Sequence, residues 1–377
     1  MPKLTWTVTH LDSVGAGTDI TSRVLSMNIT GGREQYLDPY SGGGVVITIN
    51  NSSNYASALY YGQRLRIWSG DNDPIEFNQY FWIQEITFDD AVGGVGLNTA
   101  TIVGVDWLAR SGRVQADNVA LISDTVGGNL TQLKTATLPS DMKFSQEYVN
   151  SLASSINYTG TFLNYLNLGV TTERSFVTQF LDYANFIGRG DAAYMQPIST
   201  TLGRTTSATQ IAYMEFERIQ NGTQFINKAT ISSAGLADQT ATNSSSLTAY
   251  GPAFYSSQTV DATTTQALGN AEWIVNTFGE PNALRFVVSF SDVAQNSTAL
   301  ASWMASIWEF FHRVMTLNYT VPGGSSTSTN VLVEGSQINV TPSQTTFTLF
   351  LSPLTYYQFF TLDSSTLGIL DTSRLGW

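Results

Sequence analysis

The fold is decided by two short runs near the start of the chain, Val24-Leu25-Ser26-Met27-Asn28-Ile29 and Val45-Val46-Ile47-Thr48-Ile49. Apolar side chains recur at every second position of both runs, which is typical of antiparallel strands that are buried on one face. Turn residues rich in glycine and asparagine separate the two runs from their neighbours. The same pattern continues through 65–68, 81–88 and 99–105, so we expect residues 1–112 to form a β-barrel or β-sandwich.

The middle of the chain, residues 113–212, is expected to be a smaller mixed unit. Apolar residues at helical spacing begin after Thr172-Glu173-Arg174-Ser175 and stop at Gly188. This spacing, with a start and a stop signal, predicts an amphipathic helix over 176–187. A shorter helix is expected just before it, over 162–168.

Strands return in a second β unit, expected over residues 213–355. We expect strands at 213–219, 225–231, 284–290, 311–321, 331–334, 337–340 and 347–351, and solvated loops at 240–248 and 322–330. One helix is expected over 299–308, and a second is expected to start at the N-cap Asp261 and to end at Gly279. Residues 356–377 are expected to form a C-terminal extension. No repeat of fixed period is visible, which argues against a solenoid or a propeller.

The composition of the 377 residues excludes several classes of protein. Hydrophobic residues make up 42% of the chain, which is enough for a buried core, whereas charged residues make up only 12%. The formal net charge is −12 and no segment gathers several Lys or Arg, so we expect no sequence-specific binding of nucleic acid. The absence of Cys excludes disulfides, thiolate nucleophiles and zinc ribbons. No apolar run reaches the about 20 residues that span a membrane, and the start of the chain lacks the pattern of a signal peptide.

No group of residues assembles a catalytic or metal site in the sequence. The two histidines, His10 and His312, are far apart, and neither has neighbouring residues of the ligand type. A packed position explains them better than a role as catalyst. Acidic residues cluster in turns at Glu34 and Asp38, Asp71 and Asp73, and Asp89 and Asp90, where a turn is a better explanation than a glycosidase pair or a cation site.

The glycine pairs Gly31-Gly32 and Gly127-Gly128 match no phosphate-binding loop. Aromatic side chains on a β scaffold can bind sugars, but those interleaved with apolar residues, as in Tyr80-Phe81-Trp82, mostly form a core or an interface. We therefore expect no catalytic, cofactor-binding or metal-binding residues, no cofactor and no enzymatic activity. A sugar-binding surface stays open as an alternative.

Several short motifs follow one another in a characteristic order. The first are Asp19 to Val24, the strand Leu25 to Thr30 followed by Gly31-Gly32-Arg33, Gly44 to Asn51, Gly62 to Ile67, and Thr101 to Leu108. Later ones are 176–190, Asn227 to Ile231, Tyr250-Gly251, the helix 261–278 with Pro281 and the strand 284–290, and the ending Leu349 to Pro353, Phe360 to Asp363 and Gly368 to Gly376. In this order the motifs resemble minor tail proteins of long-tailed bacteriophages, in particular the tail-tip or baseplate hub group. The chain departs from that family at Phe81-Trp82-Ile83, where the family carries Phe-x-Gly.

The resemblance implies a mainly β fold with some α, in which two tube-type antiparallel β-barrel domains flank a smaller mixed α/β domain. The implied domains are 1–112 (first barrel), 113–212 (inserted mixed domain), 213–355 (second barrel, with helices) and 356–377 (C-terminal extension).

The implied function is structural, as a homotrimeric hub ring that links the sixfold tail tube to the threefold tail tip and encloses the DNA channel. The implied location is the tail tip of the virion, after assembly in the host cytoplasm. The implied partners are further copies of the chain and the distal tail protein, the tape measure protein and the tip or fibre proteins of the same virion. A sixfold distal tail or tube-terminating ring, and a receptor-binding or carbohydrate-binding tail module, stay open as alternatives.

Overall fold

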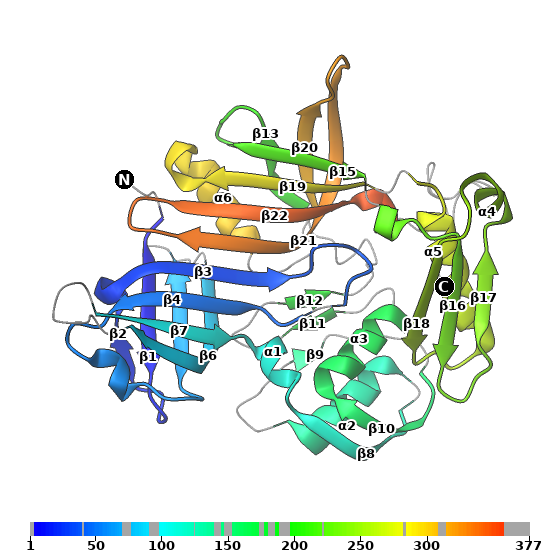
Figure 1. The fold of residues 1–377 in the computed structure, drawn as a ribbon, viewed down its shortest axis with the longest axis horizontal. Helices are drawn as coiled ribbons and strands as arrows, with labels where there is room; N and C mark the ends of the chain where they lie inside the picture. Colours follow the sequence, from blue (N-terminus) through cyan, green and yellow to red (C-terminus); the bar gives the residue numbers. More distant parts are fainter. Residues whose placement is uncertain are drawn as a thin grey trace.

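The computed structural model describes residues 4–39, 41–69, 77–89, 98–123, 125–138, 145–146, 153–172, 177–179, 185–187, 197–220, 222–281, 284–307 and 314–357. As expected, the fold is mainly β with several sheets and some helix (Figure 1). No helix within these ranges is both long and apolar enough to cross a membrane.

The first β unit contains the strands predicted from the alternating runs. Its strands are β1 (Trp6–Leu11), β2 (Gly17–Asp19), β3 (Val24–Gly32), β4 (Gly44–Asn50), β5 (Arg64–Ser69), β6 (Phe77–Asp89) and β7 (Thr99–Val105). They pair in the order β3-β4-β7-β6-β5-β1-β2, and each pair is antiparallel. Because side chains of a strand alternate between its faces, the apolar set of each strand faces one core.

The second β unit is a similar curled sheet. Its elements are β13 (Pro197–Gly203), β14 (Gln210–Ala212), β15 (Glu215–Gln220), β19 (Leu284–Ser291), α6 (Ser297–Ile307), β20 (Val314–Thr320), β21 (Ser326–Val340) and β22 (Thr345–Pro353). The pairing order is β15-β19-β22-β21-β20-β13-β14. Helix α6 packs on β13 and β14, and Trp303 of this helix lies against Phe290 and Phe347 with ring centroids 5.1 and 4.9 Å away.

The two β units are one sheet, because β21 pairs with β3 as well as with β20 and β22. Fourteen strands of the described chain belong to this sheet, and its two halves share one hydrophobic core. In Figure 1 the front layer runs without a break from β15 and β19 through β22, β21, β3 and β4 to β7. The strand path of the described residues stays open, so it forms no closed barrel.

The strand pairings reveal an internal duplication that the sequence does not show. The path β5-β6-β7-β4-β3 of the first unit has the same chain order as the path β20-β21-β22-β19-β15 of the second, and every pair in both paths is antiparallel. The sixth strands differ, because β1 pairs antiparallel with β5 whereas β13 pairs parallel with β20. Each path carries a β-bulge at the same place, at Gln84 between Ile83 and Glu85, and at Glu334 between Val333 and Gly335. A shared bulge is strong support for equivalence, because bulges are specific features of a fold.

Aligning the two bulges brings buried residues of one unit onto buried residues of the other. The pairings place Leu65 with Met315, Ile67 with Leu317, Val45 with Phe286, Ile47 with Val288, Ile49 with Phe290, Ala100 with Phe347 and Ile102 with Leu349. Every member of these pairs is buried. The repeat therefore lies in topology and burial, although the residue types differ.

A helical body with its own core follows the first β unit. It consists of α1 (Trp107–Ser111), β8 (Gln115–Leu121), α2 (Val126–Thr137), β10 (Ile156–Thr161) and α3 (Phe162–Thr172). Three short strands form a separate sheet, β9 (Ser145–Gln146), β11 (Val177–Gln179) and β12 (Asn185–Ile187). The short helix expected over 162–168 is confirmed as α3. The longer helix expected over 176–187 is wrong, because Val177↔Ile187 begins an antiparallel pairing of β11 with β12.

A third body is inserted into the second β unit between β15 and β19. It comprises β16 (Lys228–Ser233), β17 (Gln239–Thr242), α4 (Ser244–Tyr250), β18 (Phe254–Thr259) and α5 (Thr264–Phe278), and α5 packs on β16 and β17. The solvated loop expected over 240–248 is wrong, because β17 pairs with β16 and α4 is capped by Asn243.

Two further expectations need correction. The N-cap of α5 is Thr263 in a capping box with Gln266, whereas Asp261 is buried and accepts hydrogen bonds from Thr259 and Asn270. The loop expected over 322–330 is only a short turn, because β21 already begins at Ser326. The C-terminal extension beyond Tyr357 lies outside the described residues.

Candidate functional site: the joint between the two β units

The joint is the pairing of β3 with the second half of β21, and its register runs from Gly335↔Gly32 to Val340↔Met27. Ile338 and Ile29 face each other in this register and are both buried in the shared core. The joint therefore combines main-chain hydrogen bonds of a sheet with apolar burial.

Two glycines allow the strands to approach at the bulge. Gly32 has a φ of +83°, and a Cβ atom there would overlap the carbonyl oxygen of Glu334. A Cβ atom on Gly335 would lie 2.6 Å from the carbonyl oxygen of Arg33. Both positions require glycine, since other residues rarely adopt the φ of Gly32 and no side chain fits between these backbones.

A buried ion pair stabilises the joint. Arg33 Nε donates to Glu334 Oε2 at 2.8 Å, and the two side chains expose only 3% and 0% of their surface. The backbone N–H of Arg33 also donates to the Glu334 carbonyl at 3.0 Å. The bulge makes this arrangement possible, because it turns the extra residue Glu334 out of the regular ladder and toward Arg33.

The loop after Arg33 packs against the third body and so connects it with the joint. The Arg33 guanidinium lies 5.1 Å from the ring centroid of Tyr36. Tyr36 is buried among Trp273, Phe278 and Tyr356, at centroid distances of 5.3, 5.8 and 6.3 Å. The joint is thus the place where both β units and the third body meet.

A second contact holds the two units together at the start of the chain. Asp292 is buried and accepts hydrogen bonds from the backbone N–H of Leu4 at 3.2 Å and of Thr345 at 2.9 Å. Trp6 Nε1 donates to Thr345 Oγ1 at 2.9 Å. The N-terminal segment of the first unit is therefore anchored on the second.

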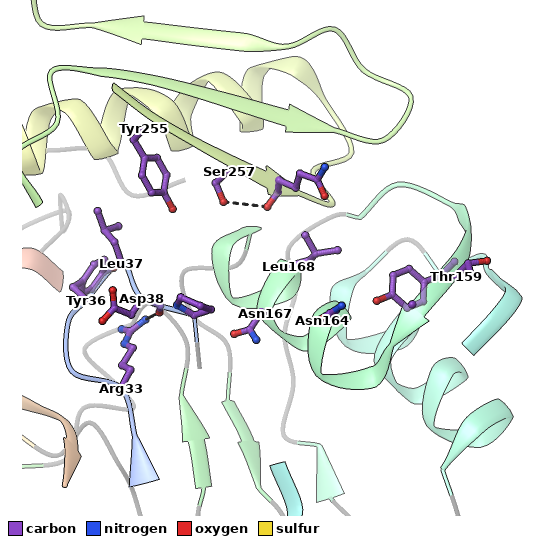
Figure 2. Close-up of a pocket in the computed structure, with 14 residues that line it drawn as sticks. Arg33, Tyr36, Leu37, Asp38, Thr159, Asn164, Asn167, Leu168, Tyr255 and Ser257 are labelled. Carbon is purple, nitrogen blue, oxygen red and sulfur yellow. Dashed lines mark hydrogen bonds between the residues drawn. The ribbon is translucent and has the colours of Figure 1, made fainter. Parts of the chain in front are cut away.

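A pocket of about 490 Å³ opens beside the joint (Figure 2). Arg33 and Asp38 lie on its loop side, Asn164 and Asn167 come from α3, and Tyr255 and Ser257 come from β18, as Figure 2 shows. Burial raises the pKa of Asp38, and the Arg33 guanidinium opposes this rise. Tyr158 also lines the pocket, and burial raises the pKa of its hydroxyl to about 12, so the hydroxyl stays protonated and donates to the Thr161 carbonyl at 2.8 Å.

The residues that line the pocket include no His, Cys or Lys. Its described surface offers amides, hydroxyls, an arginine that is already paired and the carboxyl group of Asp38.

Among the described residues, those weighed as catalytic or metal-binding form no common site. His10 is buried with its Nδ1 atom 3.3 Å from the Tyr55 hydroxyl. Glu34 is exposed and pairs with Arg285 at 3.5 Å, while Asp38 stands in the pocket wall. His312, Asp71, Asp73 and Asp90 lie outside the described residues. Within the described ranges no three His, Cys, Asp or Glu side chains are grouped in a way that would hold a metal ion.

The aromatic residues weighed as a sugar platform are mostly buried. Phe81 and Trp82 expose 0% and 3% of their surface, and Arg110 covers the Trp82 ring at 4.9 Å. Tyr80 is flanked by Arg64 and Arg66.

The sequence did not single out the joint as a site, although it held two signals for it. Glu334 is a charged residue that directly follows the apolar run Val331-Leu332-Val333, and an arginine directly follows the glycine pair Gly31-Gly32. A charge in an apolar strand predicts a buried partner, but nothing in the sequence places Arg33 and Glu334 together, 301 residues apart.

The fold is similar to that of prophage tail proteins of known structure. The prophage MuSo2 43 kDa tail protein from Shewanella oneidensis matches with a TM-score of 0.60 and 10% identity, over 93% of this chain and 98% of that one. A tail protein from Neisseria meningitidis MC58 matches with a TM-score of 0.61 and 12% identity, over the same shares. The prophage tail protein gp18 from Listeria monocytogenes EGD-e matches with a TM-score of 0.51 and 10% identity, over 91% and 94%.

No model of a known protein family matches the sequence, and no curated protein is similar to it in sequence. What the comparisons show is therefore a shared fold with these prophage tail proteins. The resemblance stated from the sequence is confirmed at this level, the fold.

Proposed function

We propose that the chain is a structural protein of a phage tail tip, a homotrimeric hub ring that links a sixfold tail tube to a threefold tip and encloses the DNA channel. The observation that carries the proposal is the internal duplication, in which one chain holds two equivalent β units joined edge to edge. A ring of three such chains presents six equivalent units, and it can therefore match a sixfold partner on one side and a threefold partner on the other. The fold similarity to prophage tail proteins supports the same role.

In this proposal the two β units, over 1–112 and 213–355, are the tube-type domains, and their open sheets close only in the ring. The mixed unit 113–212 stands between them, its strands β13 and β14 extend the second sheet, and 356–377 is the extension. The role is architectural rather than enzymatic. The partners are the distal tail protein, the tape measure protein and the tip or fibre proteins, and the location is the tail tip of the virion.

The test is the native mass of the purified chain, measured by light scattering over a range of concentrations. We expect a species of three times 41.1 kDa, about 123 kDa. A species of six times 41.1 kDa, about 247 kDa, would instead favour a sixfold distal tail ring. A monomer at all concentrations would count against a ring that forms without other tail proteins.

A further inference from the structure

The internal duplication leaves two strand edges open whose counterparts are paired inside the chain. In the joint, β3 pairs with the part of β21 that follows the bulge. The counterpart of that part of β21 is the end of β6, residues 85–89, and the counterpart of β3 is β15. Within the described residues, 85–89 pairs only with β7, and β15 pairs only with β19.

These two edges are the ends of one continuous layer. The described strands pair in the order β15-β19-β22-β21-β3-β4-β7-β6, with each neighbouring pair antiparallel. An open edge is a template for pairing with another chain unless it is covered. A layer with an open strand at each end can therefore continue from one copy into the next.

The side chains on both edges are accessible. Phe88 exposes 45% of its surface, and Thr87 and Asp89 are exposed as well. In β15, four of six residues are exposed, among them Glu217 and Arg218. The counterparts of Phe88 and Arg218 are Ile338 and Ile29, which are buried in the joint.

We propose that β15 of one copy pairs antiparallel with residues 85–89 of β6 in the next copy, so that the joint within each chain is repeated between chains. The occupant is a second copy of this chain, because the joint already shows which strand an edge of this kind accepts. The contact joins two different surfaces, so it is head-to-tail, and it gives a ring when the rotation between copies closes, as the trimer proposed above requires. This inference rests on the ring assembly proposed above and names the surfaces that form it.

The register follows from the joint. Its pairs Gln337↔Thr30, Ile338↔Ile29 and Asn339↔Asn28 become Thr87 opposite Ile219, Phe88 opposite Arg218 and Asp89 opposite Glu217 between copies. Arg218 then lies against the ring of Phe88, which is a favourable contact between a cation and an aromatic face. Asp89 and Glu217 bring two negative charges together where the joint has two asparagines, and like charges directly opposite each other weaken a strand pair.

Engineered cysteines test the register without interference, because the chain has no Cys. The variant T87C/I219C is oxidised and separated without reductant, and the variant T30C/Q337C, at the equivalent positions of the joint, is the matched control. We expect T30C/Q337C to form a disulfide within one chain and T87C/I219C to link chains into a covalent trimer. The single variants T87C and I219C are expected to form no covalent species larger than a dimer.

Charge reversal supplies a second test. The expected direction of the change in assembly distinguishes the proposed register from a nonspecific effect of surface charge. D89K and E217K are each expected to strengthen assembly, by roughly 1.5- to 5-fold in dissociation constant per interface. The double variant D89K/E217K restores a like-charged pair and is expected to lose this gain. Three equal effects of one sign would contradict the register.

The outcomes separate this inference from the proposed function. A native trimer whose T87C/I219C variant stays monomeric under denaturing conditions, while T30C/Q337C closes, would overturn the strand pairing and leave the trimeric ring standing. A chain that is monomeric at all concentrations and is not linked by T87C/I219C would count against both.

Discussion

Removing the negative charge of Glu334 is expected to open the joint. The variant E334Q keeps the shape of the side chain but leaves the Arg33 guanidinium, only 3% exposed, without the carboxylate that lies 2.8 Å away. Breaking a buried pair on one side typically costs about 3 to 5 kcal/mol. We expect about 3 kcal/mol, the low end of that range, because the introduced amide can still accept one hydrogen bond and Arg33 keeps its contact with Tyr36.

The assay is hydrogen exchange of the β3 and β21 amides, because a chain with three separate cores need not unfold in a single step. The loss is expected in these two strands, while the amides of β16 and α5 keep their protection. The control is E34Q, which breaks the exposed pair of Glu34 with Arg285 and is expected to cost under about 1 kcal/mol.

The double variant R33M/E334L removes both charges and fills the same space with apolar groups. We expect it to return the protection of β3 and β21 to within about 1 kcal/mol of the unmodified chain, since a buried pair is often replaceable by apolar residues. The reasoning is wrong if E334Q costs less than about 1 kcal/mol. It is also wrong if the cost of R33M/E334L equals the sum of the costs of the single variants R33M and E334L.

Three other substitutions test the remaining steps. G32A is expected to lower the unfolding temperature by several degrees, because the φ of +83° and the nearby Glu334 carbonyl exclude a Cβ atom. W303A empties space beside Phe290 and Phe347 in the shared core and is expected to cost about 3 to 5 kcal/mol in urea unfolding. Burial raises the pKa of Asp106 to about 7, so the folded chain holds a proton that the unfolded chain releases near pH 4. Stability is therefore expected to fall between about pH 4 and pH 7, by up to about 4 kcal/mol, because each unit of pKa difference corresponds to about 1.4 kcal/mol. The difference between the unfolding temperatures at pH 5 and pH 8 should be smaller in D106N than in the unmodified chain. An unchanged difference would show that Asp106 does not cause the pH dependence.

Local pattern was sufficient where a strand or helix is decided by its own residues. The runs at 24–29 and 45–49 are strands, α5 ends at Gly279, and α3 begins near Phe162, as expected. Local pattern was misleading where tertiary pairing decides the state. Residues 176–187 have apolar spacing that suits a helix, yet Val177 pairs with Ile187 in a sheet. Residues 240–248 are rich in Ser and Thr, yet β16 supplies a partner strand for β17.

The sequence by itself determined the mainly β character of the protein, through the period-two pattern of its strands. It also determined the acidic net charge without basic segments, which argues against a nucleic-acid groove. Its motif order also pointed to the tail-protein fold. Only the tertiary structure decided that two units repeat one topology, that β3 and β21 join them, and that Arg33 meets Glu334. The physical reason is that a strand's own residues set which face is buried, whereas its partner is set by hydrogen bonds between backbones, which are alike for every residue type and carry no trace in the sequence.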